Sequence, residues 1–421
     1  MLSPSDRELL DGVHGEGARF AMHLVLRAAE VSGAERLIDV TRAHVDSCLY
    51  HGEATLDFVN RLVDGGARTR IPTTLNVGAV DLLHPELYRG DQRTAERGRL
   101  LMDRYRALGA RPTFTCAPYQ IADARPSFGE QVAWGESNAI AFCNSVLGAR
   151  TNRYGDFIDI AAAITGRVPY AGLHRTDARR ATLVLRLADD VPPTLHEADV
   201  LAPVLGIVLG RRAGSSVAVI DGLPAGQSED RLKAIGAAAA SSGSVAMFHV
   251  VGSTPEAATI DDALQHHAAE RVELIRIAEL RAARDELSTA TGERLAAVSL
   301  GTPHASLAEL ERYATMLGER RVHPDVECLI STGRDVMAAA TERGIVGLLH
   351  DSGVDLLVDT CSYIAPILRE AAGPTMTDSG KWAYYAPGNI GAKVVFGSSA
   401  ECIRSAVAGR VVRDFTVWGG T

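Results

Sequence analysis

Residues 135–156, GESNAIAFCNSVLGARTNRYGD, combine many hydrogen-bonding side chains with apolar ones. A surface helix would place its polar side chains on one face, and a buried helix would be largely apolar. This segment fits neither pattern, so we expect its polar groups to meet a ligand rather than bulk water. Its candidate ligand-binding residues are Ser137, Asn138, Cys143, Arg150, Asn152 and Arg153.

Six cysteines are spread along the chain, and no two of them form a CxxC pair. Cys116 in TCAPY and Cys361 in DTCSY follow predicted strands and lie beside hydroxyl residues. Cys143 lies on a predicted helix in line with Ile140 and Val146. Each of the three is interpretable as a core residue or as a ligand. Three soft ligands with no fourth protein ligand would suit an iron-sulfur centre with an exposed iron.

Other candidate residues also have two interpretations each. The polar residues at the end of one predicted strand, which would either hydrogen-bond a substrate or cap a turn, are Thr73, Thr74 and Asn76. His51 is either catalytic or a histidine of a surface loop. Lys381 in SGKW is either a substrate-facing cation or a solvated lysine. Tyr384 is either a proton donor or a structural tyrosine.

The sequence lacks the usual motifs for nucleotide and zinc-protease chemistry. DSGKW has Trp382 where a P-loop needs a hydroxyl residue, and neither HExxH nor a GxGxxG at a strand end occurs. The net charge of −9 argues against a nucleic-acid partner, which usually needs a basic surface. The longest apolar run, from Val200 to Gly210, has about half of the ~20 residues that span a bilayer. We therefore expect a folded cytoplasmic protein.

Strand and helix patterns alternate along the C-terminal half. Predicted strands at 295–300, 326–330, 355–358 and 393–396 run into helices through GTPH, STG, DTCS and GSS. Such units are typical of parallel sheets, whose ligands bind at the carboxyl ends of the strands. The N-terminal half repeats this pattern at IPTTLN and RPTFTCAPYQ. The sequence therefore predicts an α/β fold with its candidate residues at the edges of parallel sheets.

The chain length of 421 residues indicates two or three globular units. A soft boundary is predicted near 195–215, after the connection-like segment DDVPP. The N-terminal α/β region, 1–205, then carries TCAPY and GESNAIAFCNS, and the C-terminal α/β region, 206–421, carries GTPH, DTCS and SGKW.

Seven separated motifs together resemble those of one known family. In chain order they are HVDSCLYHGEATLDF, IPTTLNVGAVD, TCAPY, GESNAIAFCNSVLGARTNRYGD, SLGTPHASLAEL, LVDTCSY and SGKWAYYAPG. They resemble the large catalytic part of the aconitase X family over about Ser3 to Arg410. The resemblance implies an aconitase-like α/β architecture with parallel sheets flanked by helices in two or three subdomains. It also implies a lyase that removes water from a hydroxy acid with the help of an iron-sulfur cluster.

The family has two substrate branches. One branch dehydrates cis-3-hydroxy-L-proline to Δ1-pyrroline-2-carboxylate, and the other dehydrates mevalonate 5-phosphate. GTPH places Thr302 where the mevalonate-phosphate branch has cysteine, and FCNS places Cys143 where that branch usually has alanine. The resemblance therefore implies the hydroxyproline branch, with a two-iron, two-sulfur cluster held by Cys116, Cys143 and Cys361.

The resemblance also implies roles for the other candidates. The residues expected to anchor a carboxylate or a loop are Arg150, Asn152 and Arg153, because a planar guanidinium matches a carboxylate. Ser137 and Asn138 are expected near the cluster or the substrate. Lys381 is expected to face the substrate, and His51 is the preferred catalytic histidine.

Aconitase X enzymes need a small swivelling domain in addition to the large catalytic part. We expect a separate small subunit to supply this domain and a catalytic serine, because the 421 residues leave no segment for it. Three alternatives stand beside this prediction. They are a mevalonate 5-phosphate dehydratase, a non-catalytic subunit that binds a partner and keeps the cysteines in its core, and a zinc site on the same three thiolates.

Overall fold

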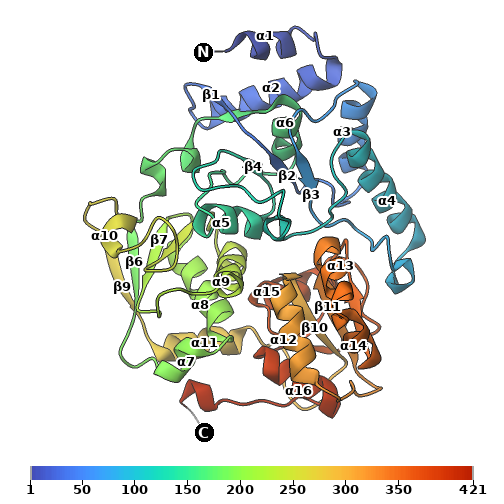
Figure 1. Cartoon of the computed structure of the whole chain (residues 1–421), viewed down its shortest axis with the longest axis vertical. Helices are drawn as coiled ribbons and strands as arrows, with labels where there is room; N and C mark the ends of the chain where they lie inside the picture. Colours follow the sequence, from blue (N-terminus) through green and yellow to red (C-terminus); the bar gives the residue numbers. More distant parts are fainter. Residues whose placement is uncertain (1, 420–421) are drawn as a thin grey trace.

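The computed structural model describes residues 2–419, which form three α/β units arranged around a shared centre (Figure 1). Each unit contains a parallel sheet with helices packed beside it. The α/β class with parallel sheets flanked by helices, predicted from the sequence, is confirmed. In the part of the chain that the structure describes, no helix is both long and apolar enough to cross a membrane.

The first unit contains a three-stranded parallel sheet in the order β3-β2-β4 and a separate antiparallel pair of β1 and β5. Its strands are β1 (Leu37–Asp39), β2 (Ala43–Val45), β3 (Thr73–Leu75), β4 (Ala133–Trp134) and β5 (Arg167–Pro169). Its helices are α1 (Pro4–Leu10), α2 (Glu16–Val31), α3 (Glu53–Asp64), α4 (Gln92–Ala107) and α6 (Ile158–Thr165). The apolar faces of α2, α3, α4 and α6 enclose one hydrophobic core with the strands.

The second unit contains a four-stranded parallel sheet in the order β8-β7-β6-β9. Its strands are β6 (Leu183–Leu187), β7 (Ala218–Asp221), β8 (Phe248–Val250) and β9 (Arg271–Ile275). Its helices are α7 (Pro193–Glu197), α8 (Leu201–Ala213), α9 (Glu229–Ser242), α10 (Ile260–Ala263) and α11 (Ile277–Glu286). The predicted boundary at 205/206 falls inside α8, so this sheet takes strands from both sides of it.

The third unit contains a five-stranded parallel sheet in the order β12-β11-β10-β13-β14. Its strands are β10 (Ala297–Ala305), β11 (Glu327–Thr332), β12 (Val354–Leu357), β13 (Pro374–Thr377) and β14 (Lys393–Phe396). Its helices are α12 (Leu307–Leu317), α13 (Arg334–Glu342), α14 (Ile345–Asp351), α15 (Gly380–Ile390) and α16 (Ser399–Ala408). GTPH, predicted to follow a strand, lies within β10, where the register with β11 shifts between Leu300 and Ala305.

The first and third units meet through the loops that follow their strands. The amide of Gly78 donates to the carbonyl of Asp359 over 2.7 Å. The carboxylate of Asp81 accepts a hydrogen bond of 2.9 Å from the amide of Val358, and Asp359 accepts one of 3.1 Å from the amide of Leu82. These bonds satisfy buried polar groups and fix the segment before Cys361 against the first unit.

Helix α5 (Ser137–Ser145) lies near the centre of the molecule, between the first and second units, and is almost entirely buried (Figure 1). Asn144 Oδ1 accepts a hydrogen bond of 3.0 Å from the buried guanidinium of Arg179. Ser145 Oγ accepts a bond of 2.9 Å from the amide of Phe248 in β8. The polar residues at the C-terminal end of this helix therefore meet buried groups of neighbouring segments, whereas those at its N-terminal end face the candidate site.

Candidate functional site between the first and third units

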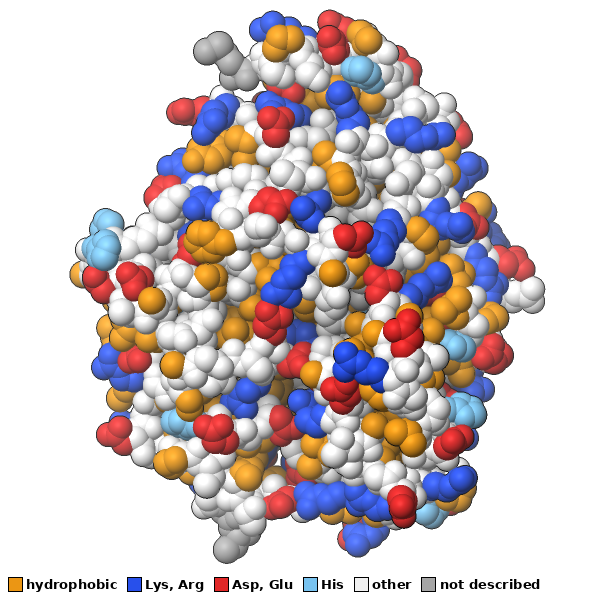
Figure 2. Space-filling view, in the orientation of Figure 1, with side chains coloured by type: hydrophobic (Ala, Val, Ile, Leu, Met, Phe, Trp, Pro, Cys, Tyr) orange, Lys and Arg blue, Asp and Glu red, His pale blue; other side chains and the backbone are white. Residues whose placement is uncertain are grey.

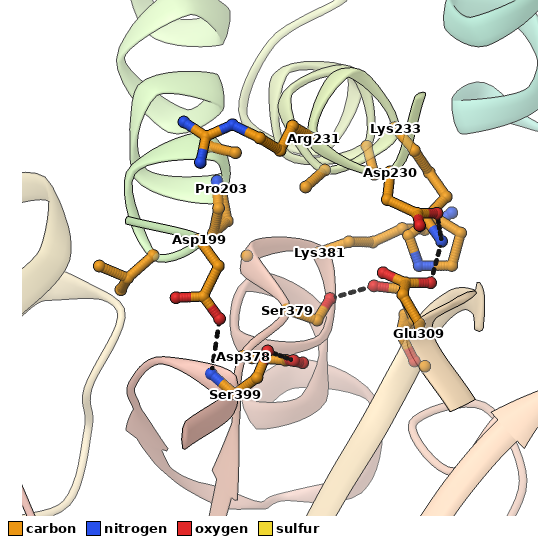
Figure 3. Close-up of a pocket in the computed structure, with 18 of the residues that line it drawn as sticks. Asp199, Pro203, Asp230, Arg231, Lys233, Glu309, Asp378, Ser379, Lys381 and Ser399 are labelled. Carbon is orange, nitrogen blue, oxygen red and sulfur yellow. Dashed lines mark hydrogen bonds and ion pairs between the residues drawn. The ribbon is translucent and has the colours of Figure 1, made fainter. Parts of the chain in front are cut away.

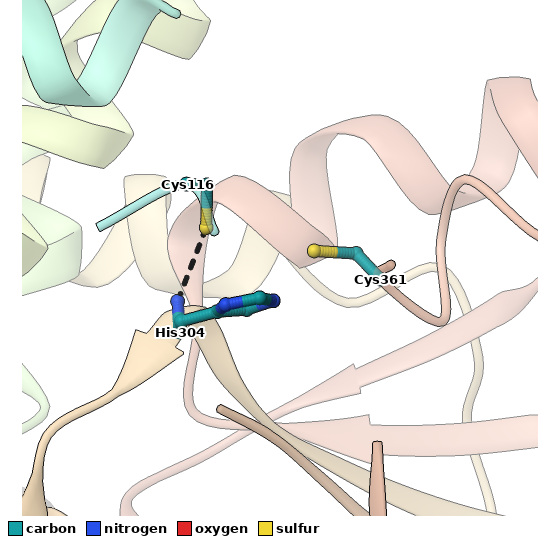
Figure 4. A group of neighbouring side chains, drawn as sticks. All are labelled: Cys116, His304 and Cys361. Carbon is teal, nitrogen blue, oxygen red and sulfur yellow. Dashed lines mark hydrogen bonds between the residues drawn. The ribbon is translucent and has the colours of Figure 1, made fainter. Parts of the chain in front are cut away.

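Two cysteines and one histidine form a buried group where the first and third units meet (Figure 4). The ligand atoms of Cys116, His304 and Cys361 lie within 4.8 Å of one another. All three side chains are buried, and the amide of His304 donates to Cys116 Sγ over 3.2 Å. The structure thus places two of the three predicted ligands, Cys116 and Cys361, side by side, and adds His304 to the group.

The backbone of both units positions these three residues. The amide of Thr115 donates to the carbonyl of Leu75 in β3, which places Cys116 beside the edge of the first sheet. Cys361 follows β12, and His304 belongs to β10 in the same sheet. The strands β10 and β12 are parallel, so His304 and Cys361 lie at one edge of the third sheet, and Cys116 meets them from the first unit.

The imidazole of His304 is held by one hydrogen bond at each nitrogen. Nε2 lies 3.2 Å from the carbonyl of Thr360, and Nδ1 lies 2.9 Å from Thr115 Oγ1. A carbonyl only accepts, so Nε2 carries a proton and donates to Thr360. The two bonds fix the orientation of the ring and give each of its nitrogens a protein partner.

The two thiols share a hydrogen bond that makes them unequal. Burial alone would raise the pKa of Cys116, but the hydrogen bond from Cys361 and the nearby charges of His304 and Lys381 lower that pKa to about 6. The same hydrogen bond, together with burial, raises the pKa of Cys361 well above its usual value. One thiolate and one thiol therefore coexist at neutral pH, and the thiolate is the form that binds a metal.

A buried ion pair lies beside the sulfur atoms. The ammonium of Lys381, in α15, contacts the carboxylate of Glu136, which begins α5. Glu136 also accepts hydrogen bonds from the Asn138 side chain and, over 2.8 Å, from the amide of Ala139. Asn138 Nδ2 donates to the carbonyl of Cys116 over 2.7 Å. The ion pair thus connects the third unit to the segment that presents Cys116.

Each charge of this pair stabilises the charged form of the other. Burial alone would raise the pKa of Glu136, but the Lys381 ammonium holds it below its usual value. Burial would lower the pKa of Lys381, but Glu136 raises it well above the ordinary range. Glu136 has a φ of 64°, in the left-handed region that non-glycine residues rarely occupy. Such strain persists where surrounding contacts hold it, and it is concentrated at functional sites.

The donor set fits a soft transition metal or one face of an iron-sulfur cluster. Two thiolates and an imidazole are the ligands that iron and zinc prefer. Three hydroxyl oxygens of the third unit are buried without a hydrogen-bond partner among the described residues, and they belong to Thr302, Ser331 and Thr360. Thr302 and Thr360 are close in sequence to His304 and Cys361, and a buried hydroxyl without a partner costs free energy.

Cys143 does not belong to this group in the structure. Its side chain packs in a separate apolar cluster with Trp134, Val132 and Ala149. Burial raises the pKa of its thiol above the usual value, which disfavours the thiolate. The face of α5 that carries Cys143 points into the first unit, while Asn138 points toward Cys116. The predicted ligand set therefore keeps Cys116 and Cys361 but not Cys143 in this arrangement.

The residues predicted at the end of β3 are bonded to protein groups. Thr73 Oγ1 donates to the carbonyl of Ile71 over 2.8 Å, as a turn cap does. Thr74 Oγ1 lies 2.9 Å from Nδ1 of the buried His44. The side-chain amide of Asn76 donates to the carboxylate of Asp46. Thr74 and Asn76 thus each contact a titratable side chain, His44 and Asp46 respectively.

The arginine segment after α5 holds a neighbouring loop. Arg150 Nη1 donates to the carbonyl of His174 over 3.2 Å and to Thr176 Oγ1 over 2.9 Å. Asn152 donates to the carbonyl of Ala171 over 2.9 Å. In these bonds Arg150 and Asn152 anchor the loop at residues 171–176, so the donors expected to bind a substrate carboxylate are already occupied by protein groups. Arg153 is exposed at a surface cavity that contains none of the three grouped ligands.

The other predicted site residues differ in burial. Ser137 Oγ donates to Glu136 over 3.2 Å, so it lies beside the buried ion pair. His51 is exposed. Tyr384 is 46% exposed and contacts Tyr385 edge to face. The structure thus places Ser137 and Lys381 at the site, whereas His51 and Tyr384 face solvent.

A cavity between the second and third units opens next to Lys381 (Figure 3). Its charged residues are Asp199, Asp230, Arg231, Lys233, Glu309, Arg312, Asp378 and Lys381. The ammonium of Lys233 contacts Glu309 and lies 3.1 Å from Asp230. Figure 2 shows side chains of both signs along the hollow between these units. The site therefore offers charged groups of both signs to a small polar molecule.

Comparisons with known proteins agree with this arrangement. The chain matches family models of three successive domains, the aconitase X first domain over residues 1–177, the second over 181–285 and the third over 295–408. The cis-3-hydroxy-L-proline dehydratase of Pseudomonas aeruginosa is 42% identical over 420 residues, which cover 99% of this chain and 72% of that protein. The phosphomevalonate dehydratase large subunit of Methanothermobacter thermautotrophicus is 35% identical over 96% of this chain and 98% of that protein.

A solved structure shows the same likeness. The crystal structure of Thermococcus kodakaraensis aconitase X in its holo-form superposes with a TM-score of 0.85 and 29% sequence identity. The match covers 96% of this chain and 100% of that one. The three matched domains correspond to the three α/β units, whose sheets contain β2–β4, β6–β9 and β10–β14.

Proposed function

The chain belongs to the aconitase X family of dehydratases, and from this premise we propose that it is the catalytic large subunit of a cis-3-hydroxy-L-proline dehydratase. The observation that carries the proposal is 42% identity to a cis-3-hydroxy-L-proline dehydratase over 99% of this chain. Identity to a phosphomevalonate dehydratase large subunit is lower, at 35%. A cytoplasmic location is part of the proposal.

The reaction removes the proton on C2 and the hydroxyl group on C3 of the proline ring. The enamine that results rearranges to Δ1-pyrroline-2-carboxylate. Neither bond breaks readily unaided, because the C2 proton is weakly acidic and hydroxide is a poor leaving group. A site for this reaction needs a base, an acid for the leaving oxygen, and fixed charges around the carboxylate.

Cys116 and Cys361 are the residues that would hold an iron-sulfur cluster in this chain, with His304 beside them, and the two-iron, two-sulfur type remains part of the proposal. When bound, such a cluster supplies a Lewis-acidic iron that polarises the leaving oxygen. The chain itself contributes the residues that hold the ligands in place. Glu136 and Lys381 fix Asn138 and the backbone of Cys116, and burial keeps water away from them.

The charged cavity supports a small zwitterionic substrate. It presents four carboxylates and four cations, and several of these are already paired with one another. An amino acid such as hydroxyproline carries one charge of each sign at neutral pH. A mevalonate phosphate is a multiple anion, which would need an excess of cations. The balance of charges is therefore more compatible with the hydroxyproline substrate.

A small partner subunit belongs to the proposal. The chain covers 98% of a protein named as a large subunit, and 72% of the longer hydroxyproline dehydratase. The segment that the chain does not match would correspond to the swivelling domain, with the predicted catalytic serine. Activity is then expected only when this part is supplied.

The proposal predicts a substrate preference that turnover measures. With the small subunit of the same enzyme added under anaerobic conditions, the chain is expected to convert cis-3-hydroxy-L-proline at least about 10²-fold more efficiently, in kcat/KM, than mevalonate 5-phosphate. Product is detected as Δ1-pyrroline-2-carboxylate by NMR. A reversed preference would identify the mevalonate 5-phosphate dehydratase instead. Turnover of neither substrate, by an assembled complex, would support the non-catalytic subunit.

A further inference from the structure

Three residues converge at the carboxyl edge of the first sheet. Asp46 follows the central strand β2, Asn76 follows β3, and Glu136 follows β4. All three strands are parallel, so these side chains share the edge at which α/β proteins bind their ligands. Glu136 belongs to the site already described, through Lys381 and Asn138. Asp46 lies on the same edge and has no role so far.

The carboxyl group of Asp46 is held on one side only. Its Oδ1 accepts a hydrogen bond from the side-chain amide of Asn76. Its backbone amide donates to Asp159 Oδ2 over 2.6 Å, and Gly135 packs so closely that an added Cβ would lie 3.1 Å from Asp46 Cβ. These contacts fix the side chain. Oδ2 makes no hydrogen bond within residues 2–419, and Asp46 is only partly buried.

The charges around Asp46 are negative. They are those of Glu136 from the start of α5, of Asp156 from the segment before α6, and of Asp159 from α6. His44, on the same strand, is neutral because burial lowers its pKa to about 3. Within the described part of the chain, Asp46 has no cationic partner, in contrast to Glu136. Burial, then the charges of Glu136 and Asp156, raise the pKa of Asp46 to about 8.

A carboxyl group in this state is a proton donor at neutral pH. Catalysis by proton transfer is most effective when the pKa of the group lies near the working pH. The catalytic residues predicted from the sequence are less suited to the task. Lys381 is fixed in an ion pair with Glu136, whereas His51 and Tyr384 face solvent.

We propose that the carboxyl group of Asp46 donates the proton that converts the departing C3 hydroxyl group of the substrate into water. This role rests on the proposed function. The C3–O bond breaks, the electron pair of the C2–H bond forms the C2–C3 double bond, and the C2 proton passes to a base. In cis-3-hydroxy-L-proline the hydroxyl and carboxylate share one ring face, so the C2 hydrogen lies on the other. The acid and the base are therefore different groups, with the base supplied from the opposite side by the partner subunit.

The test compares Asp46→Asn with wild type in the complete two-subunit enzyme. The asparagine keeps the hydrogen bond with Asn76 and cannot donate a carboxyl proton. We expect kcat for cis-3-hydroxy-L-proline to fall about 10²- to 10⁴-fold with KM changed less than about threefold. An acid acts while protonated, so wild-type kcat falls as pH rises through about 8, and this limb is absent from Asp46→Asn. Asp57→Asn, on the exposed surface of α3, is the control and keeps wild-type kcat.

Two results would overturn the role of Asp46. One is an Asp46→Asn enzyme with kcat within about threefold of wild type and an unchanged alkaline limb. The other is a ¹³C NMR titration of labelled aspartate carboxyl groups in wild type and in Asp46→Asn. The role of Asp46 is refuted if the two proteins show the same set of signals that titrate above pH 7. A wild-type enzyme that does not dehydrate cis-3-hydroxy-L-proline would instead refute the proposed function, and the NMR titration would still report on the carboxyl group.

Discussion

Replacing Cys116 or Cys361 with serine is expected to abolish dehydration, with kcat reduced about 10³-fold or more in each variant. The two thiols are the soft donors of the buried group, and a serine hydroxyl is a poor ligand for iron. A metal that polarises a leaving oxygen supplies several kcal/mol of transition-state stabilisation, and about 1.4 kcal/mol corresponds to a factor of ten in rate. The measurement is anaerobic turnover with the small subunit, together with circular dichroism to verify folding.

Cys143→Ala is the matched control for these variants. Cys143 is as deeply buried as the other two, but it packs among apolar side chains away from the grouped ligands. We expect Cys143→Ala to retain kcat within about threefold and to lose about 1 kcal/mol of stability from the small cavity. A loss of turnover equal to that of Cys116→Ser would return Cys143 to the ligand set predicted from the sequence. It would also mean that α5 adopts a different rotation in the loaded enzyme.

Breaking the Glu136–Lys381 pair is expected to reduce both stability and activity. Lys381→Met leaves a carboxylate buried without a counter-charge, and Glu136→Gln leaves an ammonium in the same state. Removing one partner of a buried ion pair costs about 3–5 kcal/mol. We expect the free energy of unfolding in urea to fall by this amount in each variant, and turnover to fall about 10²-fold or more because Asn138 and Cys116 lose their support.

A double-mutant cycle separates the pair from its surroundings. The Glu136→Gln/Lys381→Met double variant should lose less stability than the sum of the single variants, because neither charge is then left alone. Arg97→Met, which removes half of an exposed ion pair with Glu53, should leave the unfolding free energy nearly unchanged. If the single variants are as stable as Arg97→Met and the losses are additive, Glu136 and Lys381 do not act as a pair.

The repeated strand and helix patterns predicted four of the five strands of the third sheet, but neither β13 nor the sheet of the second unit. Short apolar runs ending in polar residues mark the carboxyl ends of parallel strands, and such ends meet at one edge whatever their separation in sequence. For this reason GTPH and DTCSY could be placed at one edge, whereas the grouping of Cys116 with Cys361 came from the resemblance. The structure brings the two sulfur atoms within 4.8 Å of each other. His304 stood within the motif GTPH, so the signal that could have identified it was present.

The rest of the site depends on contacts that periodicity does not encode. The rotation of α5 decides whether Cys143 faces the first unit or Cys116, and small residues on both faces leave that rotation open. The partner of Lys381 is Glu136, which is 245 positions away and has an unusual backbone conformation. Asn76, predicted to contact a substrate, donates to Asp46, whose environment depends on three other carboxylates. The boundary predicted at 205/206 divides α8, whose Gly206 and Gly210 allow it to pack closely against α9.

The most direct test of the account is the iron and acid-labile sulfide content per chain after anaerobic purification of wild type, Cys143→Ala and Cys116→Ser. The account predicts near-stoichiometric iron and sulfide in wild type and in Cys143→Ala, and neither in Cys116→Ser. A wild-type protein that contains zinc, or no metal, when isolated in this way would contradict the iron-sulfur site between the first and third units.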